Sequence, residues 1–177
     1  NQKVTIPLCT SVTDFDQITL RFHISGDYYF WGLDDIFLIN QSLSDPQVNN
    51  NFWASAPNVK TPANQVSAFP AMTDISNVGN VQSTNTSVNC KVVTVNSNGT
   101  FGTVHYDENK NFGSVPPCES VENEEFSTLV DQPSDVGLYE IQYRISADVN
   151  QITTNDLRTS RFLVTENEYS NALSEAE

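Results

Sequence analysis

The strongest constraint on the fold comes from a run around residue 140 in which apolar and polar side chains alternate. Residues 139–145 read Y-E-I-Q-Y-R-I, so Tyr139, Ile141, Tyr143 and Ile145 occupy every second position. Successive side chains of a strand point to opposite faces of a sheet, whereas a helical face repeats about every 3.6 residues. The run therefore predicts a β-strand with one face in a core and the other in water.

Shorter runs of the same kind recur at intervals of about ten residues, with Asn, Gly and Pro between them. The predicted strands cover residues 69–75, 88–92, 101–106, 126–130, 139–145 and 161–165, and residues 107–125 are predicted to form a loop. Leu and Lys, which favour helices, are scarce, while Val, Thr and aromatic residues are plentiful. We therefore expect an all-β chain that folds as a β-sandwich.

Residues 1–40 predict strands that cannot form a domain by themselves. Ile18, Leu20, Phe22 and Ile24 alternate with polar residues, and residues 28–39 are apolar on both faces apart from two aspartates. Two or three strands do not make a stable sandwich. We expect the rest of this unit to lie upstream in a longer protein, in another chain, or in the domain that follows.

A change of composition places a domain boundary after residue 40. The next stretch loses its periodicity and is rich in Asn, Pro, Ser and Ala, which is typical of a linker or an edge segment. Phe52 and Trp53 are costly to leave in water, so we expect them to pack between the two units. The predicted organisation is a partial unit over residues 1–40, a linker or edge segment over 41–68, a complete sandwich over 69–170 and a tail over 171–177.

The charge of the chain disfavours two classes of partner. The sequence has 8 Lys and Arg against 22 Asp and Glu, a net charge of −14, which repels phosphate backbones and anionic lipid headgroups. No apolar run approaches the about 20 residues that a membrane-spanning helix needs. We therefore expect neither nucleic-acid binding nor insertion into a membrane.

The three cysteines, Cys9, Cys90 and Cys118, allow only one intramolecular disulfide at a time. No pair has the short spacing of a zinc or redox motif. Cys90 lies in an alternating strand pattern, and Cys118 follows two prolines. In an oxidising compartment this arrangement permits a bridge between Cys90 and Cys118, and the alternative is buried thiols.

The run W-G-L-D-D-I at residues 31–36 resembles the strand that closes many extracellular jelly-roll modules, including MAM-type and carbohydrate-binding-like domains. In those families the first aspartate can hold a buried backbone turn or a structural cation. A carboxylate between apolar neighbours has to be paired or coordinated, because an unpaired buried charge is costly. Asp34 is therefore a candidate ligand of a structural calcium ion, with Asp14, Asp16 or Asp27 as helpers, and the alternative is a hydrogen-bonded turn.

The run D-V-G-L-Y at residues 135–139 resembles the D-x-G-x-Y run of immunoglobulin-like folds. There the tyrosine hydroxyl bonds to the backbone near the start of the penultimate strand. Ile141 stands where an antibody domain has a cysteine, so the inter-sheet disulfide of antibody domains is absent. We expect a structural role for Tyr139.

Four longer motifs occur in order over residues 49–170: N-F-W-A-x-A-P-N-x-K-T-P-x-N-Q-V, F-P-x-x-x-D-I-x-N-x-G, G-L-Y-E-I-Q-Y-R-I-S-A-D-x-N and N-D-x-R-T-S-R-F-L-V-T-E-N-E-Y. Together they resemble the CARDB-type, immunoglobulin-like modules of large bacterial surface proteins that use type IX secretion. The resemblances imply an all-β chain in which an immunoglobulin-like β-sandwich is preceded by the terminal strands of a jelly-roll-type sandwich.

The resemblance also implies a function and a location. Modules of this kind are non-catalytic spacers or adhesion elements of exported multidomain proteins, at the cell surface or secreted, and their partners are the neighbouring domains. The resemblance carries over no catalytic residue and no cofactor. An alternative function is that of a non-catalytic fragment of a secreted hydrolase, observed as cargo bound by the secretion machinery.

A carbohydrate-binding module is a second alternative. Tyr28 and Trp31 belong to the densest aromatic cluster of the chain and are candidates for stacking on the sugar rings of a glycan. A strand buried on both faces explains the same cluster.

Motifs of known catalytic sites are absent from the sequence. His23 and His105, the only histidines, lie in alternating strand patterns rather than in a metal-binding H-E-x-x-H motif. The sequence contains no G-x-S-x-G elbow and no phosphate-binding glycine loop. We therefore expect a protein that is not an enzyme.

Overall fold

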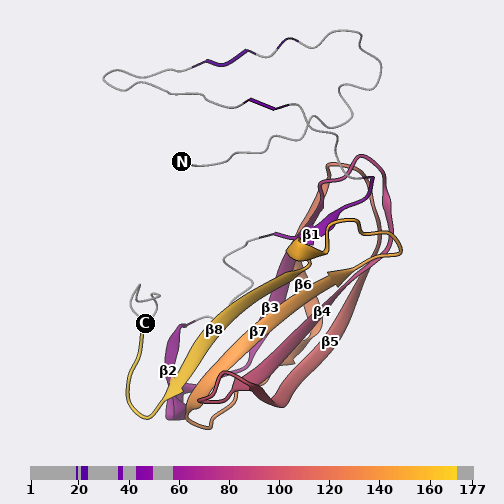
Figure 1. Cartoon of the computed structure of the whole chain (residues 1–177). Coiled ribbons are helices and arrows are strands. Elements are labelled where there is room, and N and C mark those ends of the chain that lie inside the picture. Colours follow the sequence, from indigo (N-terminus) through magenta and orange to yellow (C-terminus); the bar gives the residue numbers. More distant parts are fainter. Residues whose placement is uncertain (1–18, 20, 24–35, 38–42, 50–57, 171–177) are drawn as a thin grey trace.

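The computed structural model describes residues 19, 21–23, 36–37, 43–49 and 58–170 (Figure 1). These residues form strands and two short 3₁₀ turns, with no α-helix among them. The strands are β1 (Pro46–Val48), β2 (Lys60–Pro62), β3 (Phe69–Asn77), β4 (Ser83–Val95), β5 (Phe101–Val115), β6 (Ser120–Val130), β7 (Gly137–Ser146) and β8 (Leu157–Thr165). The 3₁₀ turns are η2 (Ala63–Gln65) and η3 (Thr153–Asn155). The prediction of an all-β chain is confirmed.

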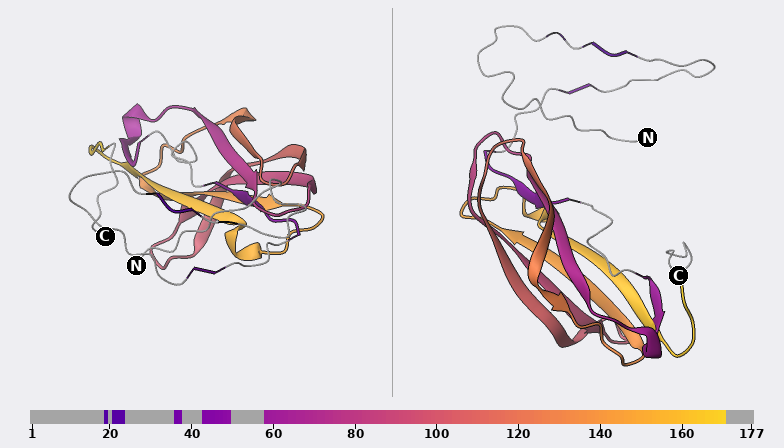
Figure 2. Two further views of the ribbon diagram at one scale, coloured as in Figure 1. Left: turned by 90° about the horizontal axis from the view of Figure 1, so that it is seen from above. Right: turned by 180° about the vertical axis from the view of Figure 1, so that it is seen from behind.

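The strands form two sheets that face each other (Figure 2). One sheet has the order β1-β3-β6, and the other has the order β2-β8-β7-β4-β5. Neighbouring strands are antiparallel except β2 and β8, which are parallel. Two sheets packed around a common apolar interior make a β-sandwich, as the sequence predicts.

The core forms where the alternation of β7 meets that of β4. In the antiparallel register Tyr143 lies opposite Cys90, and Ile141 lies opposite Val92. All four side chains are buried, and the ring of Phe126 from the other sheet packs on Tyr143 with 6.1 Å between centroids. Removing an aliphatic or aromatic side chain of this size from water contributes about 1.5–3 kcal/mol. The period of two in the sequence is therefore the spacing of the core.

Tyr139 fixes the turn that leads into β7, as the resemblance of residues 135–139 to the D-x-G-x-Y run implies. Its hydroxyl donates a hydrogen bond of 2.8 Å to the backbone carbonyl of Asp135. Its ring is buried and stacks on Phe162 of β8, with 5.3 Å between centroids and an interplanar angle of 16°. The predicted structural role of Tyr139 is confirmed.

The predicted loop over residues 107–125 is wrong. β5 continues to Val115 and β6 begins at Ser120, so only residues 116–119 separate the two strands. β5 is an edge strand of the five-stranded sheet and most of its side chains are exposed. An edge strand needs few apolar residues, so a search for apolar alternation does not find it.

The segment over residues 41–68 contributes an edge strand to each sheet. β1 pairs with β3 at the margin of the three-stranded sheet, and β2 pairs with β8 at the margin of the other. Pro62 lies in β2, where a missing N–H group is tolerated because the strand is at an edge. Phe52 and Trp53 lie outside the described residues, and the domain boundary stays a prediction.

The predicted bridge between Cys90 and Cys118 is wrong. Cys90 is a free thiol, fully buried on β4 opposite Tyr143. Cys118 lies in the turn between β5 and β6 and is disulfide-bonded. The inward position of Cys90 on a central strand uses its side chain for packing, so the buried-thiol alternative holds for Cys90.

The connections gather at two opposite ends of an elongated body (Figures 1 and 2). The turns after β3, β5 and β7 lie with residues 43–45 at one end, here termed the entry end. Val78 N–H donates to the carbonyl of Asp45 at 3.0 Å, and Gln151 N–H donates to that of Ser44 at 3.2 Å. The turns after β4 and β6 lie with residues 166–170 at the other end, the exit end.

We expect the substitution Ile141→Ala to lower the free energy of unfolding by about 2–5 kcal/mol, because it leaves a cavity beside Val92 and Tyr143. Urea denaturation followed by circular dichroism measures the change. The control is Val104→Ala on β5, where the side chain is exposed and the expected change is below about 0.5 kcal/mol. Equal losses in the two variants would contradict the assignment of the core.

Candidate functional site

The site residues predicted from the sequence lie outside the part of the chain that the structure describes. These are the aromatic candidates Tyr28 and Trp31, the calcium candidate Asp34 and its helpers Asp14, Asp16 and Asp27. The carbohydrate and calcium hypotheses therefore stay predictions. Among the described residues, no group of three or more His, Cys, Asp and Glu is placed to hold a metal ion.

His105 is held by contacts that do not make a catalytic relay. It lies on β5 and is exposed, with Nε2 at 2.8 Å from the hydroxyl oxygen of Thr94. Its ring also packs against the ring of Tyr139 in a T-shaped arrangement, with 5.3 Å between centroids. A Ser–His–Asp relay needs a carboxylate on the second ring nitrogen, and these two contacts supply none.

The thiol of Cys90 is unreactive near neutral pH. Burial raises the pKa of its thiol from 9.0 to about 12. The thiolate is the reactive form of cysteine, so almost no Cys90 is ionised near neutral pH. Cys90 is therefore a packing residue rather than a nucleophile.

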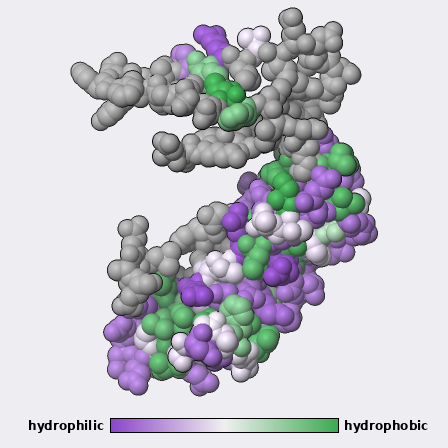
Figure 3. Space-filling model, viewed as in Figure 1, coloured by the Kyte–Doolittle hydropathy of each residue, from purple (hydrophilic) through white to green (hydrophobic). Residues whose placement is uncertain are grey.

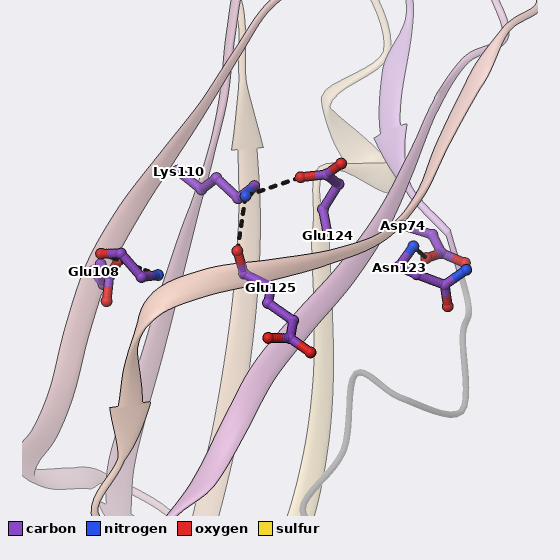
Figure 4. Close-up of polar contacts among 7 residues, drawn as sticks. Asp74, Glu108, Lys110, Asn123, Glu124 and Glu125 are labelled. Atoms are coloured by element: carbon purple, nitrogen blue, oxygen red, sulfur yellow. Dashed lines mark hydrogen bonds and ion pairs between the residues drawn. The ribbon is translucent and has the colours of Figure 1, made fainter.

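A dense polar cluster joins the two sheets along one side of the sandwich (Figure 4). It is built by Glu108 and Lys110 of β5 and by residues 124–128 of β6, and it is here termed the β5–β6 bridge. β5 and β6 are the edge strands of different sheets, with no described strand on their outer sides. The bridge therefore lies where the sandwich would otherwise be open.

Glu108 supplies the acceptors of the bridge. Its carboxylate accepts hydrogen bonds from the backbone N–H groups of Ser127 at 2.8 Å and Thr128 at 3.1 Å. The hydroxyls of the same two residues also donate to it. Tyr106 donates its hydroxyl to the same carboxylate at 2.8 Å. One side chain of β5 thus satisfies two N–H groups on the free edge of β6.

Lys110 supplies the donors of the bridge. Its Nζ donates to the backbone carbonyl of Glu125 at 2.7 Å and forms an ion pair of 2.9 Å with Glu124 (Figure 4). Farther along β6, Asn123 N–H donates to the carboxylate of Asp74 on β3 at 2.7 Å. Glu108 and Lys110 together occupy donor and acceptor positions that a further strand would otherwise use, which protects the edge against pairing with another chain.

The electrostatics of the bridge suit a structural role. Hydrogen bonds from Ser127 and Thr128 lower the pKa of the Glu108 carboxyl from 4.5 to about 2. Burial raises the pKa of the Tyr106 hydroxyl, which keeps it a donor. A general acid or base works best with a pKa near the ambient pH. Glu108 remains ionised with its oxygens occupied, so it holds the two sheets together rather than exchanging protons.

Sequence reasoning missed the bridge because both of its β5 residues fall in the predicted loop. One signal was present. Glu108 and Lys110 are two positions apart, which places opposite charges on one face of an extended strand. The partners on β6 are mainly backbone groups, and a sequence pattern does not reveal them.

A shallow hollow lies at the exit end. It is open to solvent and is lined by Val136, Gly137 and residues 163–168. This lining contains two glutamates and no histidine or aromatic ring. Ligand sites usually combine an enclosed apolar wall with a few convergent polar groups, and the hollow does not have that form.

Comparisons of the chain with protein-family models, with curated proteins and with solved structures found no match. In the described part of the chain, no helix is both long enough and apolar enough to span a membrane.

We expect the stability of the protein to fall as the pH drops from about 4.5 towards about 2, in part through Glu108. The pKa of Glu108 is lower in the folded state, so its contribution is present above pH 4.5 and is lost as the carboxyl gains a proton near pH 2. In Glu108→Gln this part of the pH dependence should disappear, and the urea midpoint at pH 7 should be lower than in the unsubstituted protein.

The control is Glu122→Gln, an exposed glutamate on the same strand that the bridge reaches. It should keep both the urea midpoint at pH 7 and the acid dependence of the unsubstituted protein. The same acid dependence in Glu108→Gln as in the control would refute the role given to Glu108.

Proposed function

We propose that the chain is a non-catalytic spacer or adhesion module of an exported multidomain protein, located at the cell surface or secreted. In this proposal residues 43–170 are an immunoglobulin-like sandwich that separates what lies before it from what lies after it. The proposal agrees with the resemblance to CARDB-type modules of type IX-secreted proteins. Its partners are the neighbouring parts of the same protein.

One observation carries the proposal: the chain enters and leaves the sandwich at opposite ends. Residue 43 lies at the entry end, where Leu43 N–H donates to the side chain of Gln151 at 2.8 Å. Ser170 lies at the exit end, where its backbone exchanges hydrogen bonds with that of Lys60. The sandwich therefore sets a fixed distance, and the strand β5 of 15 residues extends for about 50 Å. A distance of this kind is what a spacer provides.

The strand order supports the immunoglobulin-like part of the proposal. The neighbours β8-β7-β4 correspond to strands G, F and C of an immunoglobulin sandwich, and the pair β3-β6 corresponds to strands B and E of the opposite sheet. β5 then takes the place of C′, which variable-type domains add beside C. The Tyr139 hydrogen bond to Asp135 lies at the start of the strand that corresponds to F.

Two features support export. Cys118 is disulfide-bonded, and disulfides persist mainly in oxidising compartments outside the cytosol. The net charge of −14 favours solubility in a protein exposed to the medium. Neither feature identifies a ligand.

A spacer must resist a pull between its ends, and the topology predicts that this one does. Force applied at residues 43 and 170 loads the hydrogen bonds of β1 with β3 and of β2 with β8 along the strand direction, so that they share the load. Force applied at residues 98 and 170, both at the exit end, peels strands apart one bond at a time. We expect a higher unfolding force in the first geometry, measured by single-molecule pulling with handles at these positions.

Because forced unfolding reports the unfolding rate, both geometries are compared at one pulling speed in the same protein. An unfolding force for the 43–170 geometry that is equal to or below that for the 98–170 geometry would contradict a spacer that resists a pull between its ends.

A further inference from the structure

The entry end carries apolar side chains that the sandwich itself does not cover. Leu43, Val81, Val149 and Ile152 are between 43% and 55% exposed, and they come from three separate segments of the chain. Apolar side chains are visible among polar ones at this end, which is the upper end of the coloured sandwich in Figure 3. These four residues are here termed the entry-end patch.

Backbone hydrogen bonds hold the segments of the patch in one surface. Val81 N–H donates to the carbonyl of Leu43, and Gln151 N–H donates to that of Ser44. Gly79 packs directly on residues 43–45, because a Cβ at this position would lie 2.8 Å from the carbonyl oxygen of Leu43 and from the Cα of Ser44. The segments of the patch are therefore held in a fixed arrangement relative to one another and are not independent loops.

Cys118 lies at the same end and is linked to the patch by hydrogen bonds. Its N–H donates to the carbonyl of Asn77 at 2.7 Å, and the Asn77 side chain donates to the carbonyl of Val81 at 2.8 Å. Cys118 is disulfide-bonded, whereas Cys90 is a free thiol. The sequence has three cysteines, so Cys9 is the one left in the chain to pair with Cys118.

We propose that residues 1–42 dock on the entry-end patch and that a disulfide between Cys9 and Cys118 fixes them there. The segment continues directly into Leu43, so it reaches the patch without a linker. Its own apolar residues also need a cover, since Phe22, Ile36 and Phe37 are exposed and the two or three strands predicted there from the sequence cannot form a core alone. Two incomplete apolar surfaces at one junction bury each other. This inference does not depend on whether the module is a spacer.

Formation of the bond is a two-electron oxidation. The thiols of Cys9 and Cys118 lose two protons and two electrons as their sulfurs join. A disulfide-type oxidant takes up the two protons and the two electrons and is reduced to two thiols. Cys90 takes no part, because burial keeps it protonated.

The first test maps the disulfide in the full chain. The protein is denatured without reductant, free thiols are alkylated, and peptides are identified by mass spectrometry. We expect alkylation at Cys90 alone and one linked pair of peptides that contain Cys9 and Cys118. Alkylation of all three cysteines, or a bridge that contains Cys90, would overturn the proposal.

The second test measures docking by limited trypsin digestion of the oxidised chain. Under the proposal, trypsin cleaves after Arg21 only while residues 1–42 are off the patch, so the cleavage rate reports the undocked population. Val81→Asp and Val149→Asp each place a charge in the patch and should raise this rate roughly tenfold. The cut fragment should stay attached on a non-reducing gel and be released by reductant.

The matched control is Val136→Asp, a similarly exposed valine at the exit end, which should leave the cleavage rate unchanged. A near-ultraviolet circular dichroism spectrum identical to that of the unsubstituted protein shows that each variant keeps its sandwich. Equal cleavage rates in all three variants would refute docking at the patch, and release of the fragment without reductant would refute the Cys9–Cys118 disulfide.

Discussion

The structure depends on the contact between the inner faces of β4 and β7 at the centre of the larger sheet. Tyr143 against Cys90 and Ile141 against Val92 form cross-strand pairs that are buried, and the rings of Phe126 and Phe162 complete the same core. Because the side-chain period of a strand is two, a slip of one residue in this pairing would turn each of these side chains to the solvent. The register of the central pair therefore fixes which face of every other strand is buried.

The sequence predicted the parts of the fold that obey this period. The cores of β3, β4, β7 and β8 carry enough inward apolar residues to be recognised, and the Tyr139 motif marks the start of β7. The second half of β5 and the first half of β6 were not predicted, because edge strands with mostly exposed side chains have no apolar alternation. The prediction of a bridge between Cys90 and Cys118 was wrong for a related reason. The spacing of cysteines along the chain does not show that one side chain points into the core while the other lies in a turn. The β5–β6 bridge joins a side chain to backbone groups of a distant strand, so only the three-dimensional structure reveals it.

Cys90 and the polar groups of the β5–β6 bridge have structural roles in the described part of the chain. Burial keeps the Cys90 thiol protonated, and five hydrogen bonds, from Tyr106, Ser127 and Thr128, keep Glu108 ionised and occupied. Groups in these states do not transfer protons near neutral pH. The remaining distinctive features lie at the two ends of the sandwich: an apolar patch beside a disulfide-bonded cysteine where the chain enters, and an open hollow where it leaves. This difference between the ends agrees with the proposed spacer, in which the entry end binds residues 1–42.

Native-state hydrogen exchange tests most directly whether the pairing of β4 with β7 governs the fold. The backbone amides of residues 88–92 and 139–145 should exchange only through global unfolding, with the same free energy that denaturant unfolding gives, whereas amides of the edge strands β1 and β2 should exchange faster through local opening. Amides of β4 and β7 that exchange as fast as those of β1 and β2 would contradict the account, because the central pair would then not be the last part of the sandwich to open.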